Sequence, residues 1–206
     1  MNTSSFLLAA ARALSGFFRP QYFPVAGFVV LFQCTYLSLL PLAFKGVVLL
    51  LVALGTLLLP RLTVRFWRHM NGFSLFHLRR QRHRYFPYLV HILYYAFTLH
   101  ILHRFHLPSY MSGILVASLL IQVTCAFVNL RWKISMHCAG AGGVVGALVA
   151  YSLLFAFDPT TWLCLAILLC GLVGSSRMLL RQHTLGQVLA GILIGIVGGV
   201  AGILMP

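Results

Sequence analysis

Acidic side chains are almost absent from this chain of 206 residues, which has 15 lysines and arginines but a single acid, Asp158. One carboxylate excludes a glycosidase that works with a pair of carboxylic acids. It also argues against magnesium or calcium, because protein sites for these cations are built largely from carboxylate oxygens. Histidine, serine, cysteine, lysine and arginine chemistry remains, and the net charge of +14 suits an anionic ligand such as phosphate. We therefore expect neither a metal nor another cofactor.

Paired cysteine motifs are also missing. None of the five cysteines forms a C-x-x-C pair, and most of them lie within apolar runs. Free cysteines in such surroundings usually serve as small apolar core residues. We assign them no chemistry.

A stretch long enough for a soluble domain is lacking too. The chain is 61% hydrophobic with a mean hydropathy of +0.96, and its apolar runs are long enough to cross a bilayer. We predict an all-α polytopic membrane helix bundle of about six to seven transmembrane helices. Residues 1–21 are interpreted as an interfacial amphipathic segment, and residues 22–206 as a single transmembrane domain. The expected spans cover about residues 22–41, 45–60, 87–105, 109–130, 138–157, 161–175 and 184–205.

The cations are divided unequally between the two ends of this predicted bundle. When the spans are followed along the chain, every lysine and arginine except Lys45 and Arg104 falls at the same end. That end also holds the predicted loop 61–86. By the positive-inside rule it faces the cytoplasm.

The predicted loop contains a dense basic run, RRQRHRYFP, over residues 79–87. One interpretation is a topogenic loop that attracts anionic lipid headgroups. The other is a clamp that completes a phosphate site, with Arg80, Arg82 and Arg84 as candidate ligands. Its position allows both.

Two further basic stretches lie at the same end, and each one opens an apolar helix. They are RWKISMHCAGAGG, residues 131–143, and SRMLLRQHTLGQVLAG, residues 176–191. Helix N-termini carry unpaired amides and the positive end of the helix dipole, so two of them side by side form an anion site. Arg177, Lys133 and Arg131 add formal charge to it. Glycines four residues apart in both helices predict that the helices pack closely.

Each of these stretches also contains one histidine, His137 and His183. A histidine can split a phosphate ester as a nucleophile, through a phosphoenzyme intermediate. A second histidine can then protonate the leaving alkoxide. The alternative interpretation is that both rings are polar anchors at the membrane interface.

The motifs themselves resemble those of the type-2 phosphatidic acid phosphatase family. SRMLLRQH is similar to the start of that family's third motif, S-R-x5-H-x3-D, with Ser176, Arg177 and His183 at the defined positions. KISMH is similar to the second motif, P-S-G-H, with Ser135 and His137 at the matching places. The predicted order of helices around the motifs also agrees with the family.

This resemblance implies a mechanism and roles for the matching residues. His183 would be the nucleophile and His137 the general acid. Arg177, Ser176 and Ser135 would hold the phosphoryl oxygens, and no metal would take part. The reaction would be that of a lipid-phosphate or lipid-diphosphate phosphatase, or of a phosphotransferase, with a phosphohistidine intermediate.

The resemblance extends over about residues 85–205 and is greatest to short, divergent bacterial members of the family. It implies a multi-pass protein of the bacterial inner membrane. The substrate would reach the site from the bilayer, as phosphatidate or a polyprenyl phosphate would. We expect no nucleic-acid partner.

Two departures from the family pattern leave an alternative open. The first motif, K-x6-R-P, is absent, although Arg131 and Lys133 could supply its charge, with Arg84 as a looser substitute. The final aspartate of the third motif is Gln187 here. In the family that carboxylate orients the nucleophilic imidazole, and Gln187 brings no charge. The alternative is therefore a non-catalytic lipid-phosphate binder or transporter on the same scaffold.

Overall fold

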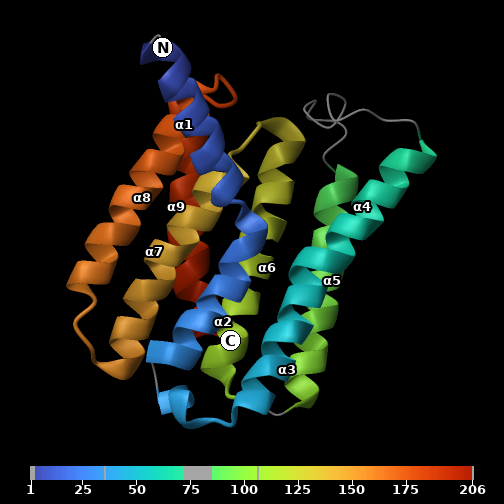
Figure 1. Cartoon of the computed structure of the whole chain (residues 1–206), viewed down its shortest axis with the longest axis vertical. Coiled ribbons are helices and arrows are strands. Elements are labelled where there is room, and N and C mark those ends of the chain that lie inside the picture. Colours follow the sequence, from blue (N-terminus) through green and yellow to red (C-terminus); the bar gives the residue numbers. More distant parts are fainter. Residues whose placement is uncertain (1–2, 35, 72–84, 106, 206) are drawn as a thin grey trace.

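The computed structural model describes residues 3–34, 36–71, 85–105 and 107–205, and within these ranges every regular element is helical (Figure 1). Short 3-10 turns, η1 (Pro20–Tyr22) and η2 (Tyr36–Leu39), flank the second helix. The helices are α1 (Thr3–Phe17), α2 (Phe23–Cys34), α3 (Leu42–Ala53), α4 (Leu59–Met70), α5 (Tyr85–Arg104), α6 (Ser109–Arg131), α7 (Met136–Phe155), α8 (Thr160–Leu179) and α9 (Leu185–Leu204).

One long helix runs through α3, a π-helical turn η3 (Leu54–Leu58) and α4. We predicted that this helix ends at Pro60, and that part of the prediction is wrong. Proline lacks an N–H group, and its ring collides with the carbonyl one turn earlier. A π turn interrupts the ordinary pattern of hydrogen bonds just before such a site, so the helix passes Pro60 and continues to Met70.

Helices α7 and α9 pack against each other with almost no space between their backbones. A Cβ atom at Gly142 or Gly146 would collide with a carbonyl oxygen of α9, and one at Gly195 or Gly199 with a carbonyl oxygen of α7. Only small residues allow such an approach between membrane helices. The predicted close pairing of these two helices is therefore confirmed.

The remaining helices surround this pair. Helix α6 contacts α9 and α5, and α8 contacts α7 (Figure 1). Helix α1 lies along α8, with Ala11 and Ser15 buried, while α2 contacts α6 and α7. The first two helices therefore add to one side of the bundle.

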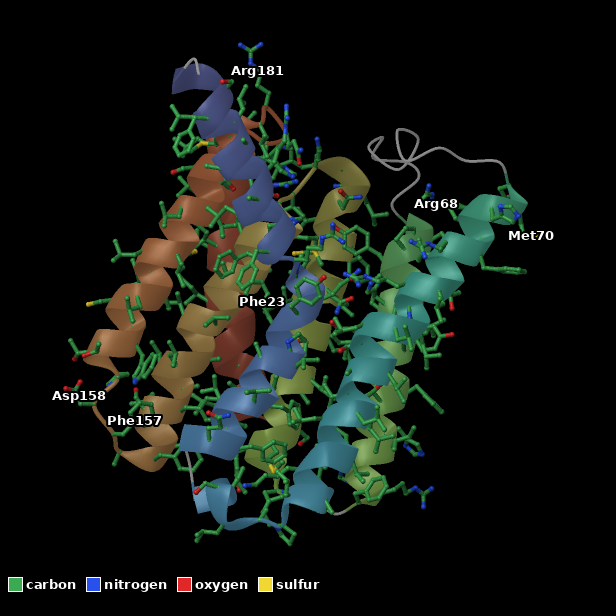
Figure 2. All side chains as sticks on the ribbon, viewed as in Figure 1. Phe23, Arg68, Met70, Phe157, Asp158 and Arg181 are labelled. Atoms are coloured by element: carbon green, nitrogen blue, oxygen red, sulfur yellow. The ribbon has the colours of Figure 1, made fainter. Side chains whose placement is uncertain are left out.

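The two ends of the bundle differ in charge, as the sequence predicts. Figure 2 shows Arg181, in the loop before α9, and the acid Asp158, in the loop before α8, at opposite ends of the molecule. The 20-residue helix α8 separates these loops, which corresponds to about 30 Å along its axis. Both motif-bearing stretches lie at the Arg181 end.

Five helices in the described part of the chain are long and apolar enough to cross a membrane. They are the composite 42–70 helix, α6, α7, α8 and α9. The expected first span, residues 22–41, is instead divided into the 12-residue α2 and the turn η2. The architecture is nevertheless the predicted one, an all-α membrane helix bundle.

Candidate active site

The nucleophile candidate, His183, lies in the tight loop just before α9. Thr184 caps that helix in a capping box, in which the Gln187 side chain accepts a hydrogen bond from the Thr184 backbone N–H at 3.3 Å. The same oxygen, Gln187 Oε1, lies 3.0 Å from His183 Nδ1. The sequence motif S/T-x-x-E/Q thus has two effects: it caps the start of α9, and it places the Gln187 oxygen next to the His183 imidazole.

The cap also determines which nitrogen of His183 carries the proton. A backbone N–H can only donate, so the amide of Gln187 must present its oxygen to Thr184. Nδ1 of His183 faces that same oxygen and must therefore donate as well. In the neutral ring the lone pair then belongs to Nε2, which is therefore the nitrogen available to act as a nucleophile.

Arg177 extends from the last turn of α8 and is 8% exposed. Its Nη1 donates a hydrogen bond to the Ser15 hydroxyl of α1. Buried arginines are normally paired with hydrogen-bond acceptors or anions. The five N–H donors of a guanidinium exceed what one hydroxyl accepts, so the group can also bind phosphoryl oxygens.

His137 lies in the first turn of α7, one residue after the start of the helix. It is close enough to Arg177, His183 and the Ser15 backbone to interact with all three electrostatically. The three predicted groups from α7, α8 and the loop before α9 are therefore gathered in one place.

Lys133 connects the two motif-bearing stretches. Its Nζ donates to the backbone carbonyl of Gln182 at 2.7 Å, and Gln182 directly precedes His183. Lys133 is not among the residues that line the cavity described below, so the structure places its charge beside the loop that carries His183. Arg131 is exposed at the end of α6.

The two predicted phosphate-binding serines are bonded within their own helices. Ser135 is fully buried as the cap of α7, where its hydroxyl accepts from the Cys138 backbone N–H and donates to Cys138 Sγ at 3.1 Å. Ser176 donates to the Val173 carbonyl at 2.7 Å. The structure does not bring either hydroxyl to the cavity described next. The basic residues Arg80, Arg82 and Arg84 lie outside the described residues.

A cavity of about 1140 Å³ opens beside the three gathered groups, and His137, Arg177 and His183 all line it. From them it continues between α2, α7 and α8 past apolar side chains that include Val144, Leu169 and Tyr151. It reaches Phe155, at the far end of α7, and Trp162, near the start of α8. The cavity therefore has a cationic end and a long apolar part within the bundle.

Ser15 is the residue of this site that the sequence does not reveal. It lies in α1, which we interpreted as an interfacial segment, yet its hydroxyl accepts a hydrogen bond from Arg177 and its backbone lies near His137. A serine in an apolar helix has no local pattern that indicates a distant partner. Only the packing of α1 on α8 brings it to the site.

The fold and this site define a class of protein, a membrane helix bundle with two histidines and an arginine at the end of an apolar cavity. Residues 51–206 match the family model of the PAP2 superfamily. The chain belongs to this superfamily, whose type-2 phosphatidic acid phosphatases it was found to resemble. Membership supports a phosphatase-type function on lipid phosphates and a multi-pass membrane location. No curated protein and no solved structure matches the chain.

Proposed function

We propose that the protein hydrolyses or transfers the phosphoryl group of a membrane lipid phosphate or diphosphate through a phosphohistidine on His183. The observation that supports this most strongly is the shared cavity wall of His137, Arg177 and His183. One cavity offers cationic and nucleophilic groups at its end and apolar residues along its length. A lipid phosphate has the matching distribution of charge and hydrocarbon.

The first step is attack by the Nε2 lone pair of His183 on phosphorus. The bond between phosphorus and the ester oxygen breaks, and protonated His137 gives its proton to the departing oxygen. Positive charge develops on the His183 ring, and the Nδ1–H bond to Gln187 Oε1 stabilises it. Arg177 binds the phosphoryl oxygens and offsets their negative charge, while Lys133 holds the adjoining loop and adds positive charge near them.

The second step reverses these roles. Water attacks the phosphorus, neutral His137 accepts the proton that the water loses, and the phosphorus–nitrogen bond breaks. Inorganic phosphate leaves, and His183 returns to its neutral form. If a hydroxyl group of another molecule replaces water, the same sequence gives phosphotransfer.

The proposal places the substrate in the bilayer of a bacterial inner membrane, with phosphatidate or a polyprenyl phosphate as the substrate class. It requires no protein-bound metal, since the chain's own cations supply the charge. Chelation with EDTA should leave the rate unchanged.

The test is a time course of phosphate release from phosphatidate and from a polyprenyl phosphate in detergent. We expect release by the wild-type protein and none by His183→Ala. Rapid alkaline quenching with labelled substrate should leave an acid-labile label on the wild-type chain only. Equal labelling of His183→Ala would refute the assignment of the nucleophile.

A non-catalytic lipid-phosphate binder or transporter remains the second candidate, because Gln187 offers His183 a neutral partner where the family has a carboxylate. It predicts saturable binding of the same lipids without phosphate release. The time course therefore separates the two functions directly.

A further inference from the structure

The region that matches the superfamily begins at residue 51, yet earlier residues form part of the site. Phe18, Pro20, Gln21 and Phe23 line the same cavity as His137 and Arg177. They belong to the connection between α1 and α2 and to the start of α2, which places the N-terminal segment over the cationic end of the cavity. The N-terminal segment therefore forms part of the cavity wall as well as contacting α8.

Within this segment, Ser15 lies against two groups of the site. Its hydroxyl accepts from Arg177 Nη1, and its backbone is close enough to the His137 ring to interact with it electrostatically. Ser15 lies in the last turn of α1, where carbonyl groups have no partner within the helix and form the negative end of the dipole. Both partners are cationic or become so in the proposed reaction, so the end of α1 is electrostatically suited to them.

The bond to Arg177 has a geometric consequence. Arginine is a long side chain whose planar fork binds phosphoryl oxygens well only in a defined orientation. A hydroxyl that accepts from one Nη group restricts rotation of that fork. Ser15 is 8% exposed, so water has little access to replace it.

We propose that Ser15 is a positioning residue of the active site: its hydroxyl orients the Arg177 guanidinium for binding of the phosphoryl group. The N-terminal segment, outside the part of the chain that matches the superfamily, thereby completes the anion site. This inference rests on the proposed function only in taking Arg177 as a phosphoryl ligand.

The test measures binding of orthovanadate and inorganic phosphate to the purified full-length protein, by ligand-dependent thermal shift in detergent. Ser15→Ala removes the hydroxyl and keeps a good helix former. We expect it to weaken binding about ten-fold, the size of a lost hydrogen bond to a charged group. Ser15→Thr, which keeps the hydroxyl, should restore most of the affinity.

Two controls distinguish positioning from general loosening of α1. Ala11 is buried one turn earlier on the same helix, so Ala11→Gly weakens the same packing without touching Arg177. It should leave anion affinity unchanged. In an Arg177→Lys background Ser15→Ala should have no further effect, because the two changes remove one interaction.

Several results would overturn the proposal. They are unchanged affinity in Ser15→Ala, an equal loss in Ala11→Gly, full additivity with Arg177→Lys, or no anion binding by the wild-type protein. If Ser15→Ala does not fold, Ser15→Cys keeps the volume with a weaker acceptor and should show the same loss. Anion binding without phosphate release would refute the hydrolase alone, so the two failures are distinguishable.

Discussion

Gln187 is the residue that separates this site most clearly from the family pattern. Its Oε1 already accepts from the Thr184 N–H and faces His183 Nδ1. Glutamate has the same length and keeps an oxygen at this place, whereas aspartate is shorter by one carbon. Gln187→Glu should therefore raise kcat, because a carboxylate stabilises the positive charge that grows on the His183 ring.

The value of kcat is measured from steady-state phosphate release. Gln187→Ala, which removes the side-chain oxygen, is the variant for comparison. Glutamate also suits the first turn of a helix, so the melting temperature should not fall. Gln187→Ala should lose about 10²-fold or more in kcat, since the ring loses the hydrogen bond to Oε1 that fixes its tautomer. A fall in kcat for Gln187→Glu would show that the site requires a neutral partner.

Lys133 supports the loop that carries His183. Its bond to the Gln182 carbonyl ties the start of α7 to the loop before α9. Lys133→Ala should lower kcat/KM about ten-fold, since a hydrogen bond from a charged group is lost next to the nucleophile. Arg104→Ala removes a charge at the opposite end of the bundle and should leave kcat/KM unchanged in the same assay. Equal losses in both variants would indicate an effect of net charge alone.

For single residues, the sequence predicts which side chains carry the chemistry better than it predicts the contacts that those side chains make. Spacing and the motif resemblance single out His137, Arg177 and His183, and the structure places all three on one cavity. The motif positions Ser135 and Ser176 are conspicuous in the sequence, but their hydroxyls are bonded inside their own helices. Ser15 has no motif, since its role depends on the packing of a distant helix.

Among the elements, the pair α7 and α9 holds the two histidines in place. A Cβ at Gly195 would meet backbone atoms of Ala139, Gly142 and Gly143, which cannot move without separating the helices. Gly195→Ala should destabilise the protein by about 1–3 kcal/mol, the usual cost of overpacking. It should also lower kcat, because α9 begins directly after His183.

The matched control is Gly171 in α8, where an added Cβ meets nothing within 4 Å. Gly171→Ala should leave the melting temperature unchanged or raise it, since alanine is the better helix former by about 1 kcal/mol. Melting in detergent and kcat are measured for both variants. A similar decrease in both would mean that the close packing is not what stabilises the bundle.

The elements near the C-terminus were predicted well because their signals are local. Apolar runs of span length and the residues that cap them define α6 to α9 within a few positions. The helices in the first half of the chain are harder to predict from the sequence. Pro60 indicates a helix end, but a π turn allows the chain to continue. The apolar run 22–41 indicates one span, but α2 ends at Cys34 and the turn η2 follows it. Such outcomes depend on what neighbouring helices tolerate rather than on local pattern.

For the molecule as a whole, the distribution of cations bears on which side of the membrane holds the site. Every lysine and arginine except Lys45 and Arg104 was predicted to lie at the end that carries His137 and His183, and the cytoplasm is the expected side of such a cluster. Some of these cations are proposed to bind the phosphoryl group, which lowers their weight as topogenic signals. The proposal assigns no phosphoryl contact to the basic residues of α4, Arg61, Arg65 and Arg68, and they still favour the cytoplasm.

Arg181→Cys and Asp158→Cys test this orientation, because Arg181 and Asp158 are exposed at opposite ends of the bundle (Figure 2). In intact bacterial cells a membrane-impermeant maleimide should label Asp158→Cys, and it should label Arg181→Cys only after permeabilisation. The wild-type protein is the control for its own cysteines. The reverse pattern would place the cationic end outside the cell. The basic residues would then be explained by binding of anionic lipid substrates from the outer leaflet rather than by the positive-inside rule.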